Sequence, residues 1–378
     1  MKRPSTFWYA VALLVASTVG IGFFGIPYTF ARAGFGVGFI LFAILTVLIL
    51  ITNLLYGEII LRTHERHQFV GYVRLYLGRW ARLANLFTFW VSVYGAFIGI
   101  LIVNGEFLSK FLSFFGYRVS PALLSTLFVV VAIGLVYAGL KTVSHVDFVV
   151  MAVSIAIVGL IAVFGIPHLS SDNFVFSNRQ AWFLPFGVIL FALNAIQGVP
   201  LVREALIGKE RLYRRALLWG TLIPAVLYIV FIVVVVGVSG ANTSPSAISG
   251  LAPKLGRGIV MVGSLFGFLT SSTIFLSIIT AFRMSLREDF QLRRRGDFLL
   301  PLLPGLILFL LGVRNFIEII GLVGGIAVSI DMILLLMVYA KSKEKGNRIP
   351  EYSLNIPRLL LYLMMGIFTI GALYTIFT

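Results

Sequence analysis

The stretch 16–27, which reads Ala-Ser-Thr-Val-Gly-Ile-Gly-Phe-Phe-Gly-Ile-Pro, holds the residues whose chemistry stands out most in this chain. Gly20, Gly22, Gly25 and Pro27 lie where an apolar segment would otherwise cross a membrane. Glycine and proline disfavour a helix, so the helix is expected to unwind here. Unwound backbone at bilayer depth needs polar partners, because lipid supplies none. The pattern therefore predicts a site for a substrate or an ion.

A second apolar stretch, 191–200, repeats this pattern as Phe-Ala-Leu-Asn-Ala-Ile-Gln-Gly-Val-Pro. Its Gly-Val-Pro ending matches the Gly-Ile-Pro ending of the first stretch. Two interrupted spans of opposite direction, five spans apart, indicate an inverted repeat with a site at the bilayer midplane. The alternative is that glycine and proline are simply frequent in membrane helices.

Each interruption offers groups that suit one end of an amino acid. Amide N–H groups at the start of a half-helix carry positive partial charge, which favours a carboxylate. We expect the first interruption to bind that carboxylate, and the second to offer carbonyls to the ammonium group and Phe191 as a wall of the side-chain pocket. The alternatives are packing of small residues between helices and amide side chains that only cap the broken backbone. The predicted substrate-binding residues are Thr18, Gly20, Ile21, Gly22, Phe23, Phe191, Asn194 and Gln197.

The composition places these stretches in a polytopic membrane protein. The chain has 378 residues, of which 60% are hydrophobic and 12% charged, and its mean hydropathy is +1.03. Apolar runs of about 20 residues recur along it, the length that crosses a bilayer as a helix. The sequence contains no cysteine, which excludes disulfides and thiol catalysis. Predicted spans run over 7–31, 35–61, 83–112, 120–140, 146–167, 183–206, 215–238, 259–282, 298–313, 315–340 and 357–377.

The net charge of +16 is a topology signal rather than a sign of nucleic-acid binding. With the N-terminus inside, the inner segments hold 23 of the 30 lysines and arginines. The positive-inside rule then predicts eleven spans in the plasma membrane, with a cytoplasmic N-terminus and an extracellular C-terminus. The inner segment 62–82 combines apolar residues with arginines, so it is expected to form an amphipathic helix on the bilayer surface.

Four motifs carry a resemblance to a known family: STVGIGFFGIPYTFARAG, NLLYGEIILRT, FGVILFALNAIQGVP and LTSSTIFLSIITAFR. They resemble the amino acid/auxin permease family, and the bacterial aromatic amino-acid permeases in particular. This family belongs to the amino acid–polyamine–cation superfamily, which has the fold of the bacterial leucine transporter. The resemblance implies one all-α transmembrane domain with a five-plus-five inverted repeat. Its parts would be repeat one over about 7–167, repeat two over about 183–340, and an extra helix over about 357–377.

The resemblance also implies a sodium site. In sodium-coupled members of the superfamily, two hydroxyls of the eighth span and three backbone carbonyls hold the ion. The matching ligands here are the carbonyls of Ala16, Val19 and Gly267 and the hydroxyls of Thr270 and Ser271. The alternative is structural, because serine and threonine in a helix also bond back to their own backbone.

Three carboxyl groups inside the spans support proton coupling instead. Asp331, Glu58 and Glu106 are each a default functional candidate at this depth. Glu58 and Glu106 have basic partners four residues on, at Arg62 and Lys110, in the orientation that favours an ion pair on a helix. Asp331 has no such local partner. It is therefore the best candidate for a proton site, or for a polar contact with another helix.

The remaining motifs do not indicate an enzyme. The spacing of Gly20, Gly22 and Gly25 matches a dinucleotide motif by letters, but it lacks the preceding strand. No catalytic residue, cofactor or metal beyond a possible Na⁺ is predicted. The sequence therefore predicts an ion-coupled symporter that moves a neutral, aromatic or branched, amino acid into the cell. The alternatives are proton rather than sodium coupling, and a non-transporting amino-acid sensor on the same fold. The expected partners are the amino acid and the bilayer, with the oligomeric state left open.

Overall fold

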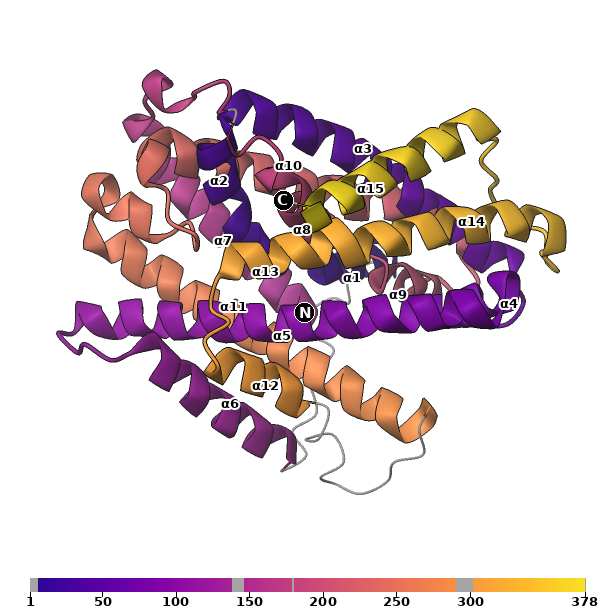
Figure 1. The fold of residues 1–378 in the computed structure, drawn as a ribbon, viewed down its shortest axis with the longest axis horizontal. Helices are drawn as coiled ribbons and strands as arrows, with labels where there is room; N and C mark the ends of the chain where they lie inside the picture. The colour runs from indigo at the N-terminus through magenta and orange to yellow at the C-terminus, as the bar shows by residue number, and fades with distance from the viewer. Residues whose placement is uncertain (1–5, 138–145, 179, 290–301, 378) are drawn as a thin grey trace.

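The computed structural model describes residues 6–137, 146–178, 180–289 and 302–377, and over these residues the regular elements are all helical (Figure 1). The α-helices are α1 (Thr6–Thr18), α2 (Gly22–Ala33), α3 (Phe35–Arg62), α4 (Phe69–Leu77), α5 (Arg79–Phe114), α6 (Pro121–Tyr137), α7 (Val146–Gly165), α8 (Leu184–Leu193), α9 (Gly198–Ala205), α10 (Tyr213–Ser239), α11 (Ala252–Asp289), α12 (Leu303–Leu310), α13 (Phe316–Leu322), α14 (Ser329–Lys345) and α15 (Arg358–Phe377). A short π-helix, Val323–Val328, lies between α13 and α14 within one span.

The helices confirm a multi-pass membrane protein. Within the described residues, seven helices are long and apolar enough to cross a bilayer, and the bent pair α1–α2 makes an eighth. Two shorter apolar helices, Pro121–Gly134 and Ile155–His168, fall below that length. The predicted span 298–313 begins outside the described residues and continues into α12. The total of eleven spans therefore stays a prediction.

Both predicted interruptions are present. The first span breaks between Thr18 and Gly22, and its two halves are bent by 56°. The second breaks between Leu193 and Gly198, where α8 and α9 still continue closely enough to form one span of 22 residues. Gly20 lies in the first break, where glycine disfavours a helix by about 1 kcal/mol relative to alanine, whereas the second break, 194–197, holds no glycine and ends at Gly198.

The two interrupted spans cross each other in antiparallel fashion. Helix α1 packs against α9, and α2 packs against α8. Around them, α5 runs across the whole molecule in Figure 1, with α6 and α12 on one side, and α11 packs against α5 as it crosses behind it. The other side holds α3, α14 and α15, and α14 packs against both of its neighbours there. The breaks therefore lie inside a bundle of long helices.

The span made of α13, the π-helix and α14 approaches α8 backbone to backbone. A Cβ added to Gly324 would lie 1.8 Å from the carbonyl oxygen of Gly187, so only glycine fits at this crossing. π-Helical turns widen a helix locally and often occur at functional sites. This one, Val323–Val328, ends three residues before Asp331. It therefore adjoins one of the predicted coupling residues.

The predicted amphipathic helix in the segment 62–82 is confirmed as α4. Tyr72 and Val73 on α4 are buried against the bundle, whereas Arg74 and Leu75 are exposed. Trp80, at the start of α5, is 82% exposed. Tryptophan and arginine on one exposed surface are typical of a segment at a membrane–water boundary. The end of the molecule that carries this segment is called the α4 end below.

Candidate functional site

The two interruptions meet through glycine contacts. A Cβ added to Gly22 would lie 2.8 Å from the Cα of Ala192 and 2.9 Å from the Phe191 ring. A Cβ on Gly198 would lie 2.7 Å from the side chain of Ser17. These distances are shorter than real contacts allow, so glycine is required at both positions. The structure thus brings the predicted residues of 18–23 and of 191–198 to one place.

The first interruption leaves backbone amides free at the start of α2. Among the described residues, the amides of Ile21 and Gly22 donate to no acceptor. The Phe23 amide makes only a turn bond of 3.3 Å to the carbonyl of Gly20. The hydroxyl of Thr18 donates to the carbonyl of Leu14 at 2.8 Å within its own helix. The backbone, rather than the Thr18 hydroxyl, is therefore the group available to a ligand here.

The two amide side chains at the second interruption differ in their surroundings. The Oδ1 atom of Asn194 accepts a bond of 3.2 Å from the backbone amide of Ile196. This is the capping role that the sequence left open for such residues. The Gln197 side chain is exposed, and the Phe191 ring is half-buried against Gly22. Asn194 therefore stabilises the break, and Phe191 is the predicted residue that borders the first interruption.

Tyr228 on α10 joins the two interruptions and was not among the residues predicted from the sequence. Its hydroxyl lies 2.9 Å from the carbonyl oxygen of Thr18 and 3.1 Å from that of Ala192. The side chain is fully buried. A buried tyrosine hydroxyl usually finds a partner, so a single tyrosine in a long aliphatic span was the signal available in the sequence.

Aromatic rings surround this junction. The rings of Phe23 and Phe231 are stacked with their centroids 4.0 Å apart. The ring of Phe24 meets that of Phe107 edge to face at 4.9 Å. The ring of Phe107 lies directly on Gly267, where an added Cβ would come within 2.2 Å of it. The rings come from α2, α5 and α10, so only the packed fold brings them together.

The residues predicted to bind sodium are distributed over two regions. Thr270 and Ser271 lie on α11, which packs mainly against α5, α6 and α7 among the described helices. The hydroxyl of Ser271 is within hydrogen-bond distance of Asn104 Oδ1 and lies 2.5 Å from the carbonyl oxygen of Gly267. The side-chain hydroxyl of Thr270 makes no hydrogen bond to another described residue. Asn104 was not among the residues predicted from the sequence, and it bonds to the hydroxyl of Ser271, one of the predicted sodium ligands.

The other two predicted sodium ligands lie at the end of α1. Val19 is 4% exposed and its amide bonds to the carbonyl of Val15 at 2.8 Å, whereas Ala16 is half-buried. The main packing partners of α1 are α7, α9 and α10. The sodium site stays a prediction.

Asp331 is buried in α14 beside two polar residues of α5. Its Oδ1 atom accepts a bond of 2.7 Å from Asn85 Nδ2 and one of 2.5 Å from Thr88 Oγ1. The Oδ1 atom of Asn85 is buried without a partner in the described structure. No lysine, arginine or histidine of the described residues forms an ion pair with Asp331. The carboxyl group is therefore held by neutral donors only.

Glu58 is also fully buried, but basic groups and a loop surround it. Its Oε1 atom accepts from Arg62 at 2.8 Å and from the hydroxyl of Ser353 at 2.9 Å, and Lys343 lies 3.3 Å away. The backbone amide of Leu354 donates to Oε2 at 2.6 Å. The predicted pairing of Glu58 with Arg62 is confirmed, and it extends to α14 and to the loop that follows.

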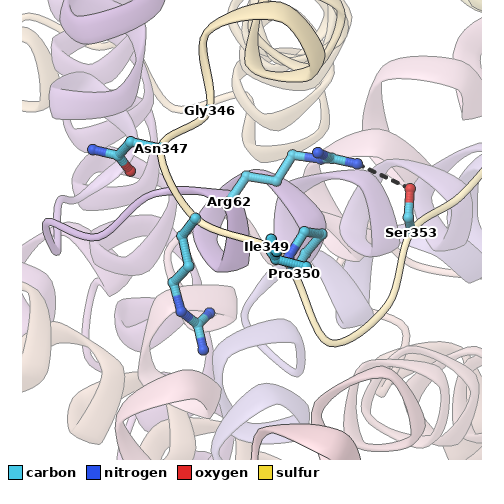
Figure 2. A pocket seen from close by; sticks show the side chains of 7 residues that line it. Arg62, Gly346, Asn347, Ile349, Pro350 and Ser353 are labelled. Atoms are coloured by element: carbon cyan, nitrogen blue, oxygen red, sulfur yellow. Dashed lines mark hydrogen bonds between the residues drawn. The ribbon is translucent and has the colours of Figure 1, made fainter.

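This loop, residues 346–357, closes the α4 end of the molecule. Tyr352 donates a bond of 2.6 Å to the carbonyl of Leu54, and burial, together with the nearby Glu58 charge, raises the pKa of Tyr352 well above its usual range. Figure 2 shows Arg62 reaching across to Ser353 at 3.0 Å beside an open cavity of about 570 Å³. The cavity is lined by Arg62, Gly346, Asn347, Arg348, Ile349, Pro350 and Ser353.

Glu106 lies near the far end of α5 and is partly exposed. Its Oε2 atom is 3.3 Å from Lys110 Nζ, which confirms the predicted pair. Lys110 also donates a bond of 2.7 Å to the hydroxyl of Ser246, in the loop between α10 and α11. Glu106 thus belongs to a surface pair, away from the junction of the two breaks.

Comparison with known proteins finds a matching family and a related transport protein. The family model of the tryptophan/tyrosine permeases matches residues 2–375. A curated relative, the tyrosine-specific transport system 2 of Haemophilus influenzae, is 25% identical over 244 residues. That match covers 61% of this chain and 58% of the relative, so the chain spans less than two thirds of the relative's length.

The family match extends over nearly the whole chain, including both interruptions and the residues around Asp331. The description of that family names permeases, which are transporters rather than enzymes. The chain belongs to the tryptophan/tyrosine permease family.

Proposed function

We propose that this chain is a secondary transporter that moves an aromatic amino acid into the cell together with a proton. The observation that carries this proposal is the junction of the two interrupted spans at Tyr228, where the free amides of Ile21 and Gly22 lie in one buried region with two carbonyls that share a single hydroxyl donor. A relative that is named as tyrosine-specific supports an aromatic substrate. Interrupted helices with a site at their crossing are typical of secondary transporters.

The junction offers complementary groups for the two charged ends of an amino acid. The free amides of Ile21 and Gly22 at the start of α2 suit the carboxylate, because a helix N-terminus carries positive partial charge. The carbonyls at the ends of α1 and α8 suit the ammonium group for the opposite reason. One face of the crossing thus favours a negative group and the other a positive group.

The rings around the junction suit an aromatic side chain. The ring of Phe24 contacts those of Phe107 and Phe231 near the first interruption, and Phe191 adjoins Gly22. Aromatic rings attract one another by about 0.5–1.5 kcal/mol beyond the area that they bury. A substrate ring that enters this group would replace contacts between the existing rings with equivalent contacts of its own.

Asp331 is the group that we propose to carry the coupling proton. Its partners Asn85 and Thr88 are neutral, so binding and release of a proton change the net charge of this buried place by one unit. Such a change in charge alters the free energy of packing α14 on α5. Protonation would thereby be coupled to a change of conformation, as a symporter requires. The neutral oxygens at Thr270 and Ser271 are the rival site, and they suit sodium.

We further propose that the α4 end faces the cytoplasm, in the plasma membrane. Arg62, Lys343 and Arg348 gather there, as the positive-inside rule requires. Transport would then rock α1–α2, α3, α8–α9 and α10 against the remaining helices around the junction. The loop 346–357 ties α3 to α14 at this end, so it would have to release for the substrate to leave.

The proposal is tested by uptake into proteoliposomes that contain the full chain. Labelled tyrosine, tryptophan, phenylalanine and leucine are offered under a proton gradient alone and under a sodium gradient alone. We expect concentrative uptake of the aromatic amino acids with the proton gradient, its collapse with a protonophore, and no effect when sodium is replaced. Uptake that requires sodium would overturn the proton assignment. Binding without uptake would indicate a sensor.

Gly22→Leu tests where the substrate binds. The leucine side chain would collide with Ala192 and Phe191 at the junction, so we expect uptake to be abolished while the amount of protein in the membrane stays unchanged. The matched control is Gly134→Leu in α6, where an added Cβ has no neighbour within 4 Å. Normal uptake by the Gly22 variant would remove the junction as the substrate site.

A further inference from the structure

The hydroxyl of Tyr228 lies at the point where two helix ends meet. Thr18 is the last residue of α1, and Ala192 lies in the last turn of α8. Their carbonyl oxygens are 2.9 Å and 3.1 Å from the same hydroxyl oxygen. The C-terminal end of a helix carries negative partial charge. Two such ends therefore converge on a single donor group.

A single hydroxyl does not fully satisfy this place. A tyrosine O–H carries one proton, so it donates a full hydrogen bond to only one of the two carbonyls at a time. A primary ammonium group has three N–H donors and a positive charge, and it can bond to both carbonyls together. The two carbonyls of Thr18 and Ala192 are thus better matched to an ammonium group than to the Tyr228 hydroxyl.

The hydroxyl and an ammonium nitrogen cannot share this position. A nitrogen that bonded both carbonyls from the side on which Tyr228 lies would overlap the hydroxyl oxygen, which is itself about 3 Å from each. The side chain is fully buried, and its ring packs on Phe23 with the centroids 5.4 Å apart. Binding of an ammonium group between these carbonyls therefore requires the hydroxyl to give up its bonds to them.

We propose that Tyr228 is a placeholder that occupies the ammonium subsite while the transporter is empty. This inference rests on the proposed function, because it requires that the substrate is an amino acid. The hydroxyl holds the ends of α1 and α8 together in the empty protein, and the arriving ammonium group takes over both carbonyls. A ligand without an ammonium group leaves the placeholder where it is. Tyr228 thus makes binding depend more strongly on an amino group in the ligand, and it lowers the affinity of the transporter for its substrate.

The test is Tyr228→Phe in the full chain, assayed in proteoliposomes. Without the hydroxyl, the carbonyls have no donor in the empty state, so the substrate gains more when it binds. We expect the KM for the aromatic amino acid to fall about fivefold, as the net effect of one neutral hydrogen bond implies. The thermal stabilisation by substrate should grow, whereas the inhibition constant of a 3-arylpropionate, which lacks the amino group, should not change.

The matched control is Tyr213→Phe. Tyr213 lies on the same helix, is equally buried, and donates to the single carbonyl of Val199 at 2.7 Å. This variant loses the same chemical group at a carbonyl inside α9, and not at the converging ends of α1 and α8, so its KM should equal that of the wild type. A lower KM in both variants would show a general effect of loosening α10 and would overturn the proposal.

The remaining outcomes are equally decisive. An unchanged or higher KM in Tyr228→Phe means that the hydroxyl is neutral toward the substrate or contacts it directly, and the placeholder role is then wrong. Tyr228→Leu is made in parallel as a second variant without a donor. If neither variant yields folded protein, the hydroxyl is a structural requirement and the proposal fails. A wild type that neither binds nor transports aromatic amino acids defeats the proposed function instead, before any variant is compared.

Discussion

Glu58 on α3 and Asp331 on α14 are both buried carboxyl groups inside membrane spans, and their surroundings differ sharply. Glu58 has two basic partners, a hydroxyl and a backbone amide. Asp331 has two neutral donors, and no cation of the described residues pairs with it. A buried charge is retained when it is paired, and it is costly when it is not. The comparison distinguishes an ion-paired carboxyl group at Glu58 from one that neutral donors hold at Asp331.

The neighbours of the two groups support the same division. Glu58 ties α3 to α14 and to the loop 346–357, which is a structural task at the α4 end. Asp331 lies just after the π-helix Val323–Val328, whose glycines pack on α8 beside the second interruption. The π-helix and α14 belong to one span, so this span connects Asp331 directly to the helix that carries the second interruption. A change at Glu58 acts on the closure of one end of the molecule.

Removing Glu58 should produce the largest effect on stability. Glu58→Ala leaves Arg62, Lys343 and the amide of Leu354 without their shared partner. We expect a loss of about 3 kcal/mol in the free energy of unfolding, the lower end of the range for breaking a buried pair, because both basic side chains reach water. Denaturant titration of the protein in detergent micelles measures it. A loss below about 1 kcal/mol would show that Glu58 contributes no more than a surface ion pair, and the contrast between Glu58 and Asp331 would then be wrong.

Removing Asp331 should act on coupling rather than on folding. Asp331→Asn keeps the shape of the side chain but cannot exchange a proton, so proton-driven accumulation should disappear while exchange of substrate across the membrane continues. A membrane potential of 100 mV contributes about 2.3 kcal/mol per charge, which corresponds to an accumulation of about 50-fold. The accumulation ratio in proteoliposomes under an imposed potential is the measurement. A variant that still concentrates its substrate would show that Asp331 only joins α14 to α5.

The sequence predicted those parts of the fold and the site that depend on residues near each other in the chain. Glycine and proline marked both interruptions, and the four-residue spacing marked the pairs Glu58–Arg62 and Glu106–Lys110. These features follow from helix geometry alone. They require no knowledge of how the spans pack.

The contacts that complete the site depend on packing, and the sequence could not give them. Asn85 lies 246 positions from Asp331, and Tyr228 lies 210 positions from Thr18. Nothing in the local pattern of an apolar helix indicates which of its polar residues will meet a distant one. The partner of Ser271 was missed for the same reason, because Asn104 lies on another span. Packing of α5 on α14 and α11, and of α10 on the interrupted spans, brings these groups together.

Glu106 should show the smallest effect and so calibrates the comparison. It is the third of the predicted coupling candidates, but its side chain is 32% exposed and that of its partner Lys110 is 26% exposed. An ion pair in contact with water contributes about 0–1 kcal/mol, so Glu106→Gln should change both the free energy of unfolding and the accumulation ratio very little. Lys110 keeps its bond to Ser246 in this variant, so it is not left alone. If Glu106→Gln instead abolished accumulation as Asp331→Asn is expected to do, then burial beside neutral donors would not be the property that distinguishes a coupling carboxylate in this protein.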